Sequence, residues 1–245
     1  MRRVLVLGAT SSIVRSIAGR LCTHGDSVFL AARSSAELER IASDLSIRYG
    51  KIVGTAAFEA TNFQGHRDLV SRARKEMGGL DGVVCALGML GDQPEDSWKA
   101  ASARTLVDVN LTAAASLISL AVEVMTPGPE AFIVGLSSVA GERGRQSNYG
   151  YGAAKGGFSI FLDGLRNRLE KKGGRVYTAK LGFVDTAMTY GKEGLFLVAQ
   201  PEQIARHIIR MLRRSSGLYY LPPLWRLIML MIRLIPEPIF KRLSL

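Results

Sequence analysis

Short apolar runs alternate with longer amphipathic stretches along nearly the whole chain. The apolar runs have the length and composition of buried strands. They cover residues 4–7, 27–32, 52–58, 80–86, 131–136, 175–181 and 217–221. Apolar residues recur at helical spacing over residues 17–22, 34–49, 64–77, 98–125, 148–172 and 201–214. This alternation predicts an α/β fold, with a Rossmann-type, doubly wound parallel β-sheet flanked by helices and joined by right-handed crossovers.

One edge of the predicted sheet gathers the candidate functional residues. In doubly wound sheets, ligands bind beyond the carboxyl ends of the strands. Residues 8–13, Arg33, Gly88, Ser138 and residues 182–186 all fall at or just after the ends of apolar runs. We therefore expect them to share one crevice, although they lie far apart in the sequence.

The first apolar run leads through Gly8-Ala9-Thr10-Ser11-Ser12-Ile13 into a helix. A strand, a tight turn and a helix together form the arrangement that holds the diphosphate of a dinucleotide. The unpaired N–H groups of a helix N-terminus attract phosphate, and Thr10, Ser11 and Ser12 add hydroxyl donors. A plain strand-to-helix turn capped by serine is the alternative interpretation.

Arg33 stands directly after the second predicted strand. At this place an acidic residue binds the ribose hydroxyls of NAD, whereas an arginine accommodates the 2′-phosphate of NADP. The chain has Ala32-Arg33 here. It therefore predicts NADP(H) rather than NAD(H), the alternative being an exposed arginine at the start of a helix.

A hydroxyl, a phenol and an ammonium group form the candidate reaction centre. Tyr151 follows Ser138 by thirteen residues, and Lys155 lies four residues further on. Residues four apart share a helix face, so Lys155 would lie beside Tyr151 and move the pKa of its phenol from roughly 10 toward the working range. Ser138 would bind the carbonyl oxygen that Tyr151 protonates, whereas Tyr149 has Ala153 in place of the lysine. The alternative is an exposed tyrosine beside a solvated lysine.

Composition and charge limit the function classes. With 245 residues, 47% hydrophobic and 22% charged, the chain suits one large folded domain. The net charge is +11, and residues 201–245 contribute eight Lys or Arg against two Glu. Because apolar residues are interleaved with these charges, an anionic membrane surface fits better than nucleic acid.

Cysteine usage and the N-terminal sequence bear on the compartment. Cys22 and Cys85 lack the spacing of a zinc site or a disulfide framework, so we expect buried free thiols in a reducing compartment and no metal. The N-terminus lacks a signal-peptide cleavage pattern, and no uninterrupted apolar stretch reaches about 18 residues. We expect a cytoplasmic protein without a transmembrane span.

With these residues in place, residues 1–221 resemble the short-chain dehydrogenase/reductase family. The family's Asn, Ser, Tyr and Lys tetrad corresponds to Asn110, Ser138, Tyr151 and Lys155. The resemblance implies that Tyr151 donates a proton to the carbonyl, Lys155 binds the nicotinamide ribose, Ser138 orients the substrate and Asn110 supports a proton relay. It implies cofactor contacts by Gly8, Thr10, Ser11, Ser12, Ile13, Arg33, Ala60, Leu87, Gly88, Tyr151, Lys155, Val184 and Thr186. It also implies a homo-oligomer, a dimer or a tetramer.

The chain departs from the family pattern near the cofactor. Family glycines are replaced by Ser12 and Val14, and the valine is expected to press its helix slightly away from the strand. The family's Asn-Asn-Ala-Gly is Cys85-Ala86-Leu87-Gly88 here. Because of these losses, a non-catalytic scaffold with the same fold is one alternative function. The intact tetrad argues against it.

Within the family, the turn 8–13, residues 140–149 and the tail resemble reductases of polyprenyl-phosphate-linked keto-sugars, which include the 2-keto-pentose reductase of decaprenylphosphoryl-arabinose synthesis. This predicts an NADPH-dependent ketoreductase acting on a lipid-linked keto-sugar. A 3-keto sphingoid base or a 3-oxoacyl chain is the alternative substrate.

Residues 222–245 form an apolar and basic tail. Arg226 and Arg233 are seven residues apart and so share one helix face, with apolar residues around the remainder. Such a helix fits a membrane interface or a lipid substrate, and an oligomer contact is the alternative. Arg143 and Arg145, between Ser138 and Tyr151, would either bind a phosphate or be solvated loop residues.

Overall fold

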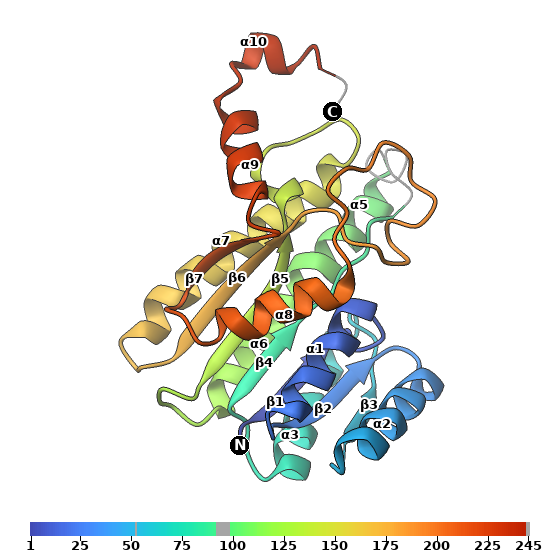
Figure 1. The fold of residues 1–245 in the computed structure, drawn as a ribbon, viewed down its shortest axis with the longest axis vertical. Coiled ribbons are helices and arrows are strands. Elements are labelled where there is room, and N and C mark those ends of the chain that lie inside the picture. The colour runs from blue at the N-terminus through green and yellow to red at the C-terminus, as the bar shows by residue number, and fades with distance from the viewer. Residues whose placement is uncertain (52, 92–98, 244–245) are drawn as a thin grey trace.

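Seven parallel strands form a single sheet in the order β3-β2-β1-β4-β5-β6-β7 (Figure 1). The computed structural model describes residues 1–51, 53–91 and 99–243. The strands are β1 (Arg3–Leu7), β2 (Ser27–Ala32), β3 (Gly54–Ala57), β4 (Gly82–Cys85), β5 (Phe132–Ser138), β6 (Arg175–Leu181) and β7 (Gly217–Leu221). Leu7 pairs with both Ala31 and Cys85, so the strands beside β1 end level with it. The predicted doubly wound parallel sheet is confirmed.

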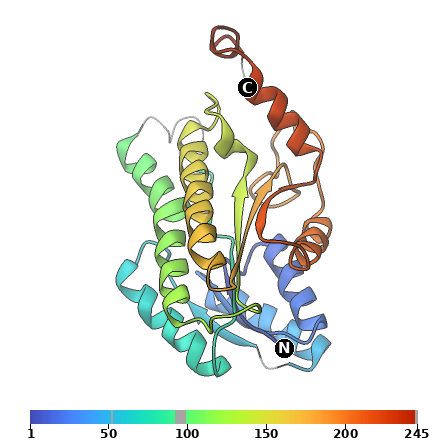
Figure 2. The ribbon, with the colours of Figure 1, turned by 90° about the vertical axis from the view of Figure 1, so that its left-hand side faces the viewer.

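Helices cover both faces of the sheet (Figure 2). One face carries α1 (Ser12–Thr23), α2 (Ser35–Tyr49) and α8 (Pro201–Met211). The other carries α3 (His66–Met77), α6 (Ala113–Val124), which follows α5 (Ala100–Val107), and α7 (Tyr149–Glu170). Because both faces are covered, strand residues of either parity are buried. In β1, Val4 and Val6 join the core on the α1 side, whereas Leu5 and Leu7 join the core on the α7 side.

The helix predicted over 98–125 is interrupted in the structure. A π-helical turn, Asp108–Thr112, separates α5 from α6. The carboxamide of Asn110 bonds the Leu106 carbonyl within the helix and also the backbone of Met89 in the loop after β4. Such tertiary contacts favour a local π-turn, and Trp98, the predicted start, lies outside the described residues.

Other boundaries differ by a few residues. The strand predicted over 52–58 is reduced to β3, and residue 52 is not described. A 3-10 turn, Phe63–Gly65, precedes α3. The helix predicted to reach residue 214 ends at Met211. The predicted bounds of β6 and β7 match the structure.

One described stretch, Ala100–Val124, is long and apolar enough to cross a membrane by length and composition alone. In the structure it contributes Ala113, Ala114, Leu117 and Ile118 to the core under the sheet. This packing is that of a core helix.

The chain continues past β7 as two further helices, α9 (Trp225–Leu234) and α10 (Glu237–Phe240). They extend beyond the carboxyl edge of the sheet, at the end of the molecule opposite the N-terminus (Figure 1). Trp225 and Met229 of α9 are buried with Val139 in a small separate core. The tail therefore docks on the edge where the candidate site lies.

Candidate active site

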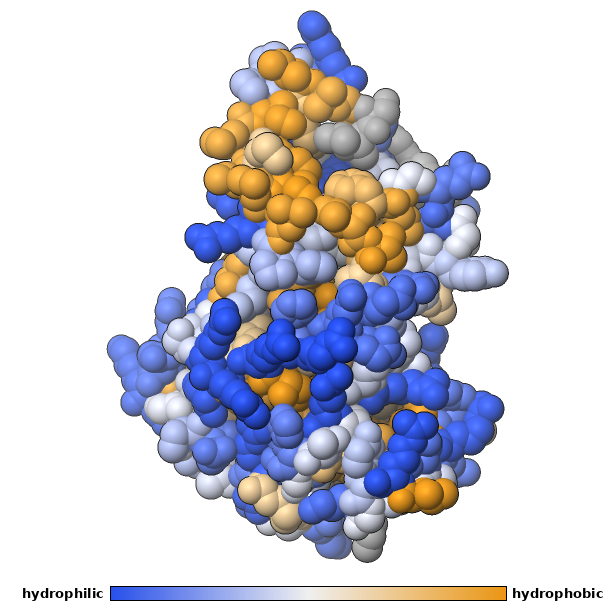
Figure 3. Space-filling view, in the orientation of Figure 1, coloured by the Kyte–Doolittle hydropathy of each residue, from blue (hydrophilic) through white to orange (hydrophobic). Residues whose placement is uncertain are grey.

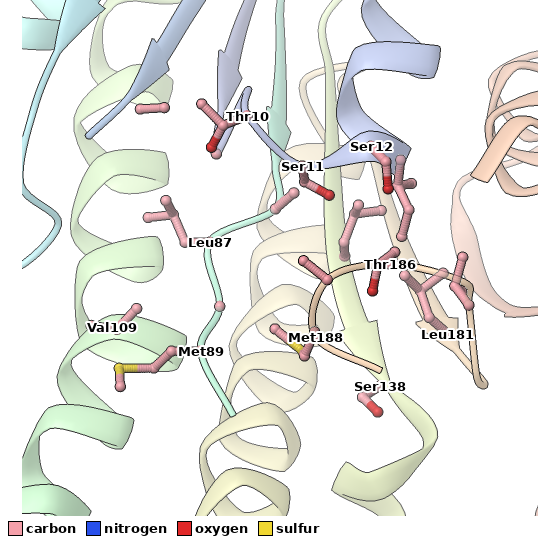
Figure 4. Close-up of a pocket in the computed structure, with 18 of the residues that line it drawn as sticks. Thr10, Ser11, Ser12, Leu87, Met89, Val109, Ser138, Leu181, Thr186 and Met188 are labelled. Atoms are coloured by element: carbon pink, nitrogen blue, oxygen red, sulfur yellow. The ribbon is translucent and has the colours of Figure 1, made fainter. Parts of the chain in front are cut away.

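A cavity of about 660 Å³ opens at the carboxyl edge of the sheet. Figure 4 shows Thr10, Ser11 and Ser12 toward one end of this cavity and Ser138 at the other, with Thr186 between them. All thirteen residues predicted to contact a cofactor line it. Among the tetrad, Ser138, Tyr151 and Lys155 line the cavity, whereas Asn110 is buried behind its wall.

The turn after β1 has the geometry of a phosphate cradle. Gly8 has a positive φ of 81°, and a Cβ there would lie 2.8 Å from the Ala86 carbonyl oxygen, so only glycine fits without strain. The first turn of α1 contains no acidic residue. The buried Ser12 Oγ has no hydrogen-bond partner among the described residues. A helix N-terminus beside an unpaired hydroxyl donor fits the diphosphate of a dinucleotide.

Val14 replaces a glycine of the family pattern, and its side chain is fully buried in the core on the α1 side of the sheet. It therefore acts as a packing residue. Ser12 replaces the other glycine of the family pattern, and this polar residue lines the cavity.

The other end of the nucleotide site is built by β2 and β3. Arg33 is exposed directly after β2 and lines the cavity together with Arg15 and Glu59. Ala60 lies in the loop after β3, and its carbonyl oxygen is 3.0 Å from Nε2 of the buried His66. The other ring nitrogen of His66 is 3.0 Å from Ser116 Oγ on α6. His66 thus fixes the cavity wall at Ala60.

Asn110 holds the loop after β4 from behind. Its Nδ2 donates to the Met89 carbonyl at 2.9 Å, and its Oδ1 accepts from the Met89 N–H at 3.2 Å. A Cβ on Gly88 would lie 3.2 Å from both Asn110 Oδ1 and Lys155 Nζ. The glycine therefore lets the amide and the ammonium approach the same point of the backbone.

Lys155 is buried, with only 4% of its surface exposed. Its Nζ donates to the Leu87 carbonyl at 2.9 Å and to the Leu136 carbonyl at 3.2 Å. Burial lowers the pKa of this ammonium to about 8. Two carbonyl dipoles, one at the end of β5 and one just after β4, thus hold a strongly desolvated cation at the cavity floor.

Tyr151 lies beside Lys155 on α7, with the ammonium 5.9 Å from the centre of its ring. The pKa of its phenol nevertheless differs from the sequence expectation. Burial raises the pKa of Tyr151 to about 12, and hydrogen bonding to Ser138 only partly opposes this. The expected net lowering of this pKa is therefore wrong for this structure, because desolvation of the buried phenol dominates.

Close backbone contacts position α7 against the segment after β5. A Cβ on Gly152 would lie 2.7 Å from the Ala140 carbonyl oxygen, and one on Gly156 would lie 2.8 Å from the Gly141 carbonyl oxygen. Ser137 Oγ adds a buried bond of 3.0 Å to the Lys155 carbonyl. The glycines let α7 approach closely enough for Tyr151 and Lys155 to reach the cavity.

A family model described as short chain dehydrogenase matches residues 2–193. This chain belongs to the short-chain dehydrogenase family. The motif residues that suggested the family lie within or just behind the cavity wall described above.

Relatives of this short-chain dehydrogenase span almost its full length. An uncharacterized oxidoreductase of Mycobacterium tuberculosis is 34% identical over 241 residues, covering 98% of this chain and 96% of the relative. An uncharacterized oxidoreductase of Streptomyces coelicolor is 34% identical over 244 residues, covering 99% and 96%. A short-chain dehydrogenase from Burkholderia cenocepacia, solved with NADP, superposes with a TM-score of 0.81 at 21% identity, covering 89% and 94% of the two chains. The names of these three proteins give no substrate.

The structure of this short-chain dehydrogenase corrects the interpretation of the two loop arginines as solvated residues. Arg143 donates to the carbonyls of Ile232 and Ile235, each at 2.6 Å, and lies 3.6 Å from the centre of the Phe240 ring. It therefore caps the C-terminus of α9 and is not a free loop residue. Arg145 contacts the Met229 sulfur at 3.5 Å, and burial lowers its pKa. Neither side chain is a solvated arginine, and neither lines the cavity.

Sequence reasoning missed several residues of this short-chain dehydrogenase site. His66 and Met89 act through contacts with residues far along the chain, and no local pattern marks them. Thr189 gave a weak signal, since it lies three residues after Thr186. Its hydroxyl accepts from the Thr186 N–H at 3.1 Å and donates to the Val184 carbonyl, which shapes the cavity wall there.

Proposed function

We propose that this protein is an NADPH-dependent ketoreductase that transfers a hydride to the carbonyl of a lipid-linked substrate. One observation carries the proposal. Ser138, Tyr151 and Lys155 line the same cavity as the phosphate cradle and Arg33, and Figure 4 shows Ser138 at the end opposite Thr10, Ser11 and Ser12. A non-catalytic scaffold has no use for a buried ammonium held at that point.

The roles of the chain's own residues follow from their positions. Because the pKa of Tyr151 is raised to about 12, its phenol is protonated at neutral pH and can donate a proton to a carbonyl oxygen. Ser138 would orient that oxygen by donating a hydrogen bond. The nearby ammonium of Lys155 would stabilise the phenolate left behind. The bound nicotinamide would supply the hydride to the carbonyl carbon.

The remaining tetrad member would support the return of the proton. Asn110 holds the Met89 backbone, and by family resemblance it supports a water-mediated proton relay toward Lys155, through which Tyr151 would regain its proton. The carbonyl thus gains one hydride and one proton and becomes an alcohol.

NADP(H) is proposed as the cofactor, ahead of NAD(H). Arg33 follows β2 directly, where a guanidinium can meet a 2′-phosphate. Two of the similar solved structures, the Burkholderia cenocepacia dehydrogenase and an actinorhodin polyketide ketoreductase, were solved with NADP and NADPH. A similar Mycobacterium paratuberculosis enzyme was solved with NAD.

The substrate we favour is a polyprenylphosphoryl keto-sugar. The sequence resemblance of the loop after β5 and the apolar residues beside the cavity support it. A 3-keto sphingoid base or a 3-oxoacyl chain is the second candidate, since either also presents a ketone on a lipid. We further propose a catalytic part, 1–221, and a tail, 222–245, in a cytoplasmic homo-oligomer that works at a membrane face.

Oxidation of NADPH by the purified protein tests the proposal, with a lipid-linked keto-sugar and a 3-keto lipid assayed side by side. Turnover of one substrate that is abolished by Tyr151→Phe would support the reductase and choose the lipid class. NADPH binding without turnover of either would refute the substrate class. Failure to bind NADPH would favour the scaffold.

A further inference from the structure

An apolar surface stands exposed beside the cavity. Leu227, Leu230, Met231 and Leu234 of α9 are each exposed by half or more, and Leu234 by 72%. A second segment, the loop after β6, exposes Phe196, Leu197 and Val198 by 42% to 51%. We call these seven residues the apolar platform. Figure 3 shows the hydrophobic residues gathered at the α9 end of the molecule, above a mainly hydrophilic body.

The two segments of the apolar platform are joined through an aromatic cluster. The Trp225 ring of α9 lies 5.2 Å from the Phe196 ring and 5.4 Å from the Phe183 ring. Trp225 also lies directly on Gly182, where a Cβ would come within 1.8 Å of its Nε1 atom. Gly182 lines the cavity, so the platform begins where the cavity wall ends.

The segment between Ser138 and Tyr151 holds the orientation of α9 through Arg143. Arg143 binds the last carbonyls of α9, pairs with Glu237 at 3.1 Å and covers the Phe240 ring. Trp225 and Met229 fill the inward face of α9, so its leucines point away from the body. An arginine is thus used to fix a helix whose outer face is apolar.

Leu197 gives an independent sign that this surface has a use. It is the one described residue other than glycine with a positive φ, 52°, and its side chain is 45% exposed. A leucine in the left-handed region is strained and gains little from packing when half exposed. Glycine would suit the backbone better.

The charges around the apolar platform distinguish its possible occupants. Arg226, Arg233, Lys241 and Arg242 are exposed near it. Two nearby carboxylates are paired with cations, Glu237 with Arg143 and Glu142 with Lys180. Glu193 is exposed in the loop after β6, directly after Lys192, so the excess of charge around the platform is positive. Two copies packed through this surface would bring like charges together, whereas anionic lipid headgroups complement them.

We propose that the apolar platform docks on an anionic lipid bilayer, with α9 and the loop at Phe196–Val198 entering the interface together. Docking would place the cavity mouth at the bilayer, so a lipid-linked ketone would enter without crossing water. That consequence rests on the proposed function; the docking does not.

Co-sedimentation of the full-length protein with vesicles tests the docking. Phosphatidylcholine vesicles with and without phosphatidylglycerol are compared at low and high salt. The double variant Leu227→Gln/Leu234→Gln should bind anionic vesicles at least about tenfold more weakly, because both side chains leave the apolar phase. The matched control, Ile47→Gln, changes a residue that is 85% exposed on α2 and should bind like the wild type.

Leu197→Gly distinguishes an effect on vesicle binding from an effect on the stability of the fold. It should weaken vesicle binding severalfold while leaving the thermal unfolding temperature unchanged or higher, because strain is relieved. The proposal would be overturned if the wild-type protein did not bind anionic vesicles, or if the variants bound them as tightly as the wild type does. Variants that turn a dimer into a monomer without affecting vesicle binding would also overturn it.

The docking and the proposed function fail separately. NADPH oxidation with a small soluble ketone should be the same for the wild type and the platform variants, because these residues do not line the cavity. Vesicle binding by a protein that reduces no ketone would support the docking and refute the reductase. Ketone reduction without vesicle binding would refute the docking and the proposed work at a membrane face, but not the reductase activity.

Discussion

Lys155→Met should make the protein more stable at neutral pH while abolishing its activity. Lys155 is nearly fully buried, and carbonyl oxygens are its only hydrogen-bonding partners among the described residues. Desolvation of the ammonium lowers its pKa from 10.5 to about 8. The charged side chain therefore destabilises the folded state below that pH, and methionine has a similar length without the charge.

The magnitude follows from the pKa shift. At about 1.4 kcal/mol per pKa unit, the charged lysine costs roughly 3 kcal/mol at pH 7. The variant leaves the Leu87 and Leu136 carbonyls without their donor, at about 1 kcal/mol each. The net stabilisation expected for Lys155→Met is thus about 1 kcal/mol, or a rise of roughly 2–4 °C in the unfolding temperature for a chain of this size.

The sign of this difference should reverse at high pH. Between the folded pKa of about 8 and the unfolded value of 10.5, the unfolded state binds more protons, so wild-type stability rises with pH. By pH 10 the cost of the lysine falls below about 1 kcal/mol. The lost hydrogen bonds then dominate, and the wild type should be the more stable protein by about 1 kcal/mol.

Urea unfolding of both proteins at pH 7 and pH 10, without cofactor, measures the difference. Raised stability at pH 7 that is lost at pH 10, together with no NADPH oxidation, is the expected result. A variant that is less stable by the same amount at both pH values would refute the reasoning. It would mean that the ammonium is well compensated and that its burial is not the source of the cost.

Three further substitutions test the cofactor end, the packing of α7 and the hold on α9. Arg33→Ala should weaken NADPH binding at least about tenfold more than NADH binding, and equal losses would defeat the assignment. Gly156→Ala would place a Cβ 2.8 Å from the Gly141 oxygen and should cost about 1–3 kcal/mol of stability and lower kcat. The control Gly164→Ala, which meets no atom within 4 Å, should stabilise by about 0.5–1 kcal/mol; thermal unfolding compares the two. Arg143→Met removes two bonds of 2.6 Å to the end of α9 and should make that helix the first site of limited proteolysis, and unchanged resistance would contradict the cap.

The sequence predicts the sheet well because its signals are local. A short apolar run of strand length that ends at turn residues is typical of a buried strand, and β6 and β7 begin and end where the pattern places them. The shared edge also follows, since parallel strands bring their carboxyl ends together. The cofactor candidates accordingly line one cavity.

The misses come from contacts between distant parts of the chain. The π-turn at Asn110 depends on the Met89 backbone, twenty-one residues earlier. Arg143 finds its partners about ninety residues later. The pKa of Tyr151 depends on how deeply α7 buries the phenol, which spacing along a helix does not reveal. Each of these is decided by tertiary packing.

The short segment between Ser138 and Tyr151 contacts two helices, α7 and α9, and its residue types differ at the two contacts. Gly141 lies against α7, where its own Cβ would come within 2.5 Å of the Gly156 nitrogen, so this side has room only for backbone. Two residues later, Arg143 is in an extended conformation and reaches across to the end of α9. Gly141 belongs to the 3-10 turn Val139–Glu142, and the chain becomes extended only at Arg143, so the backbone conformation changes between the contact with α7 and the contact with α9. The same few residues therefore fix the helix that carries Tyr151 and the helix that carries the apolar platform, and a change in either one must be accommodated by the other.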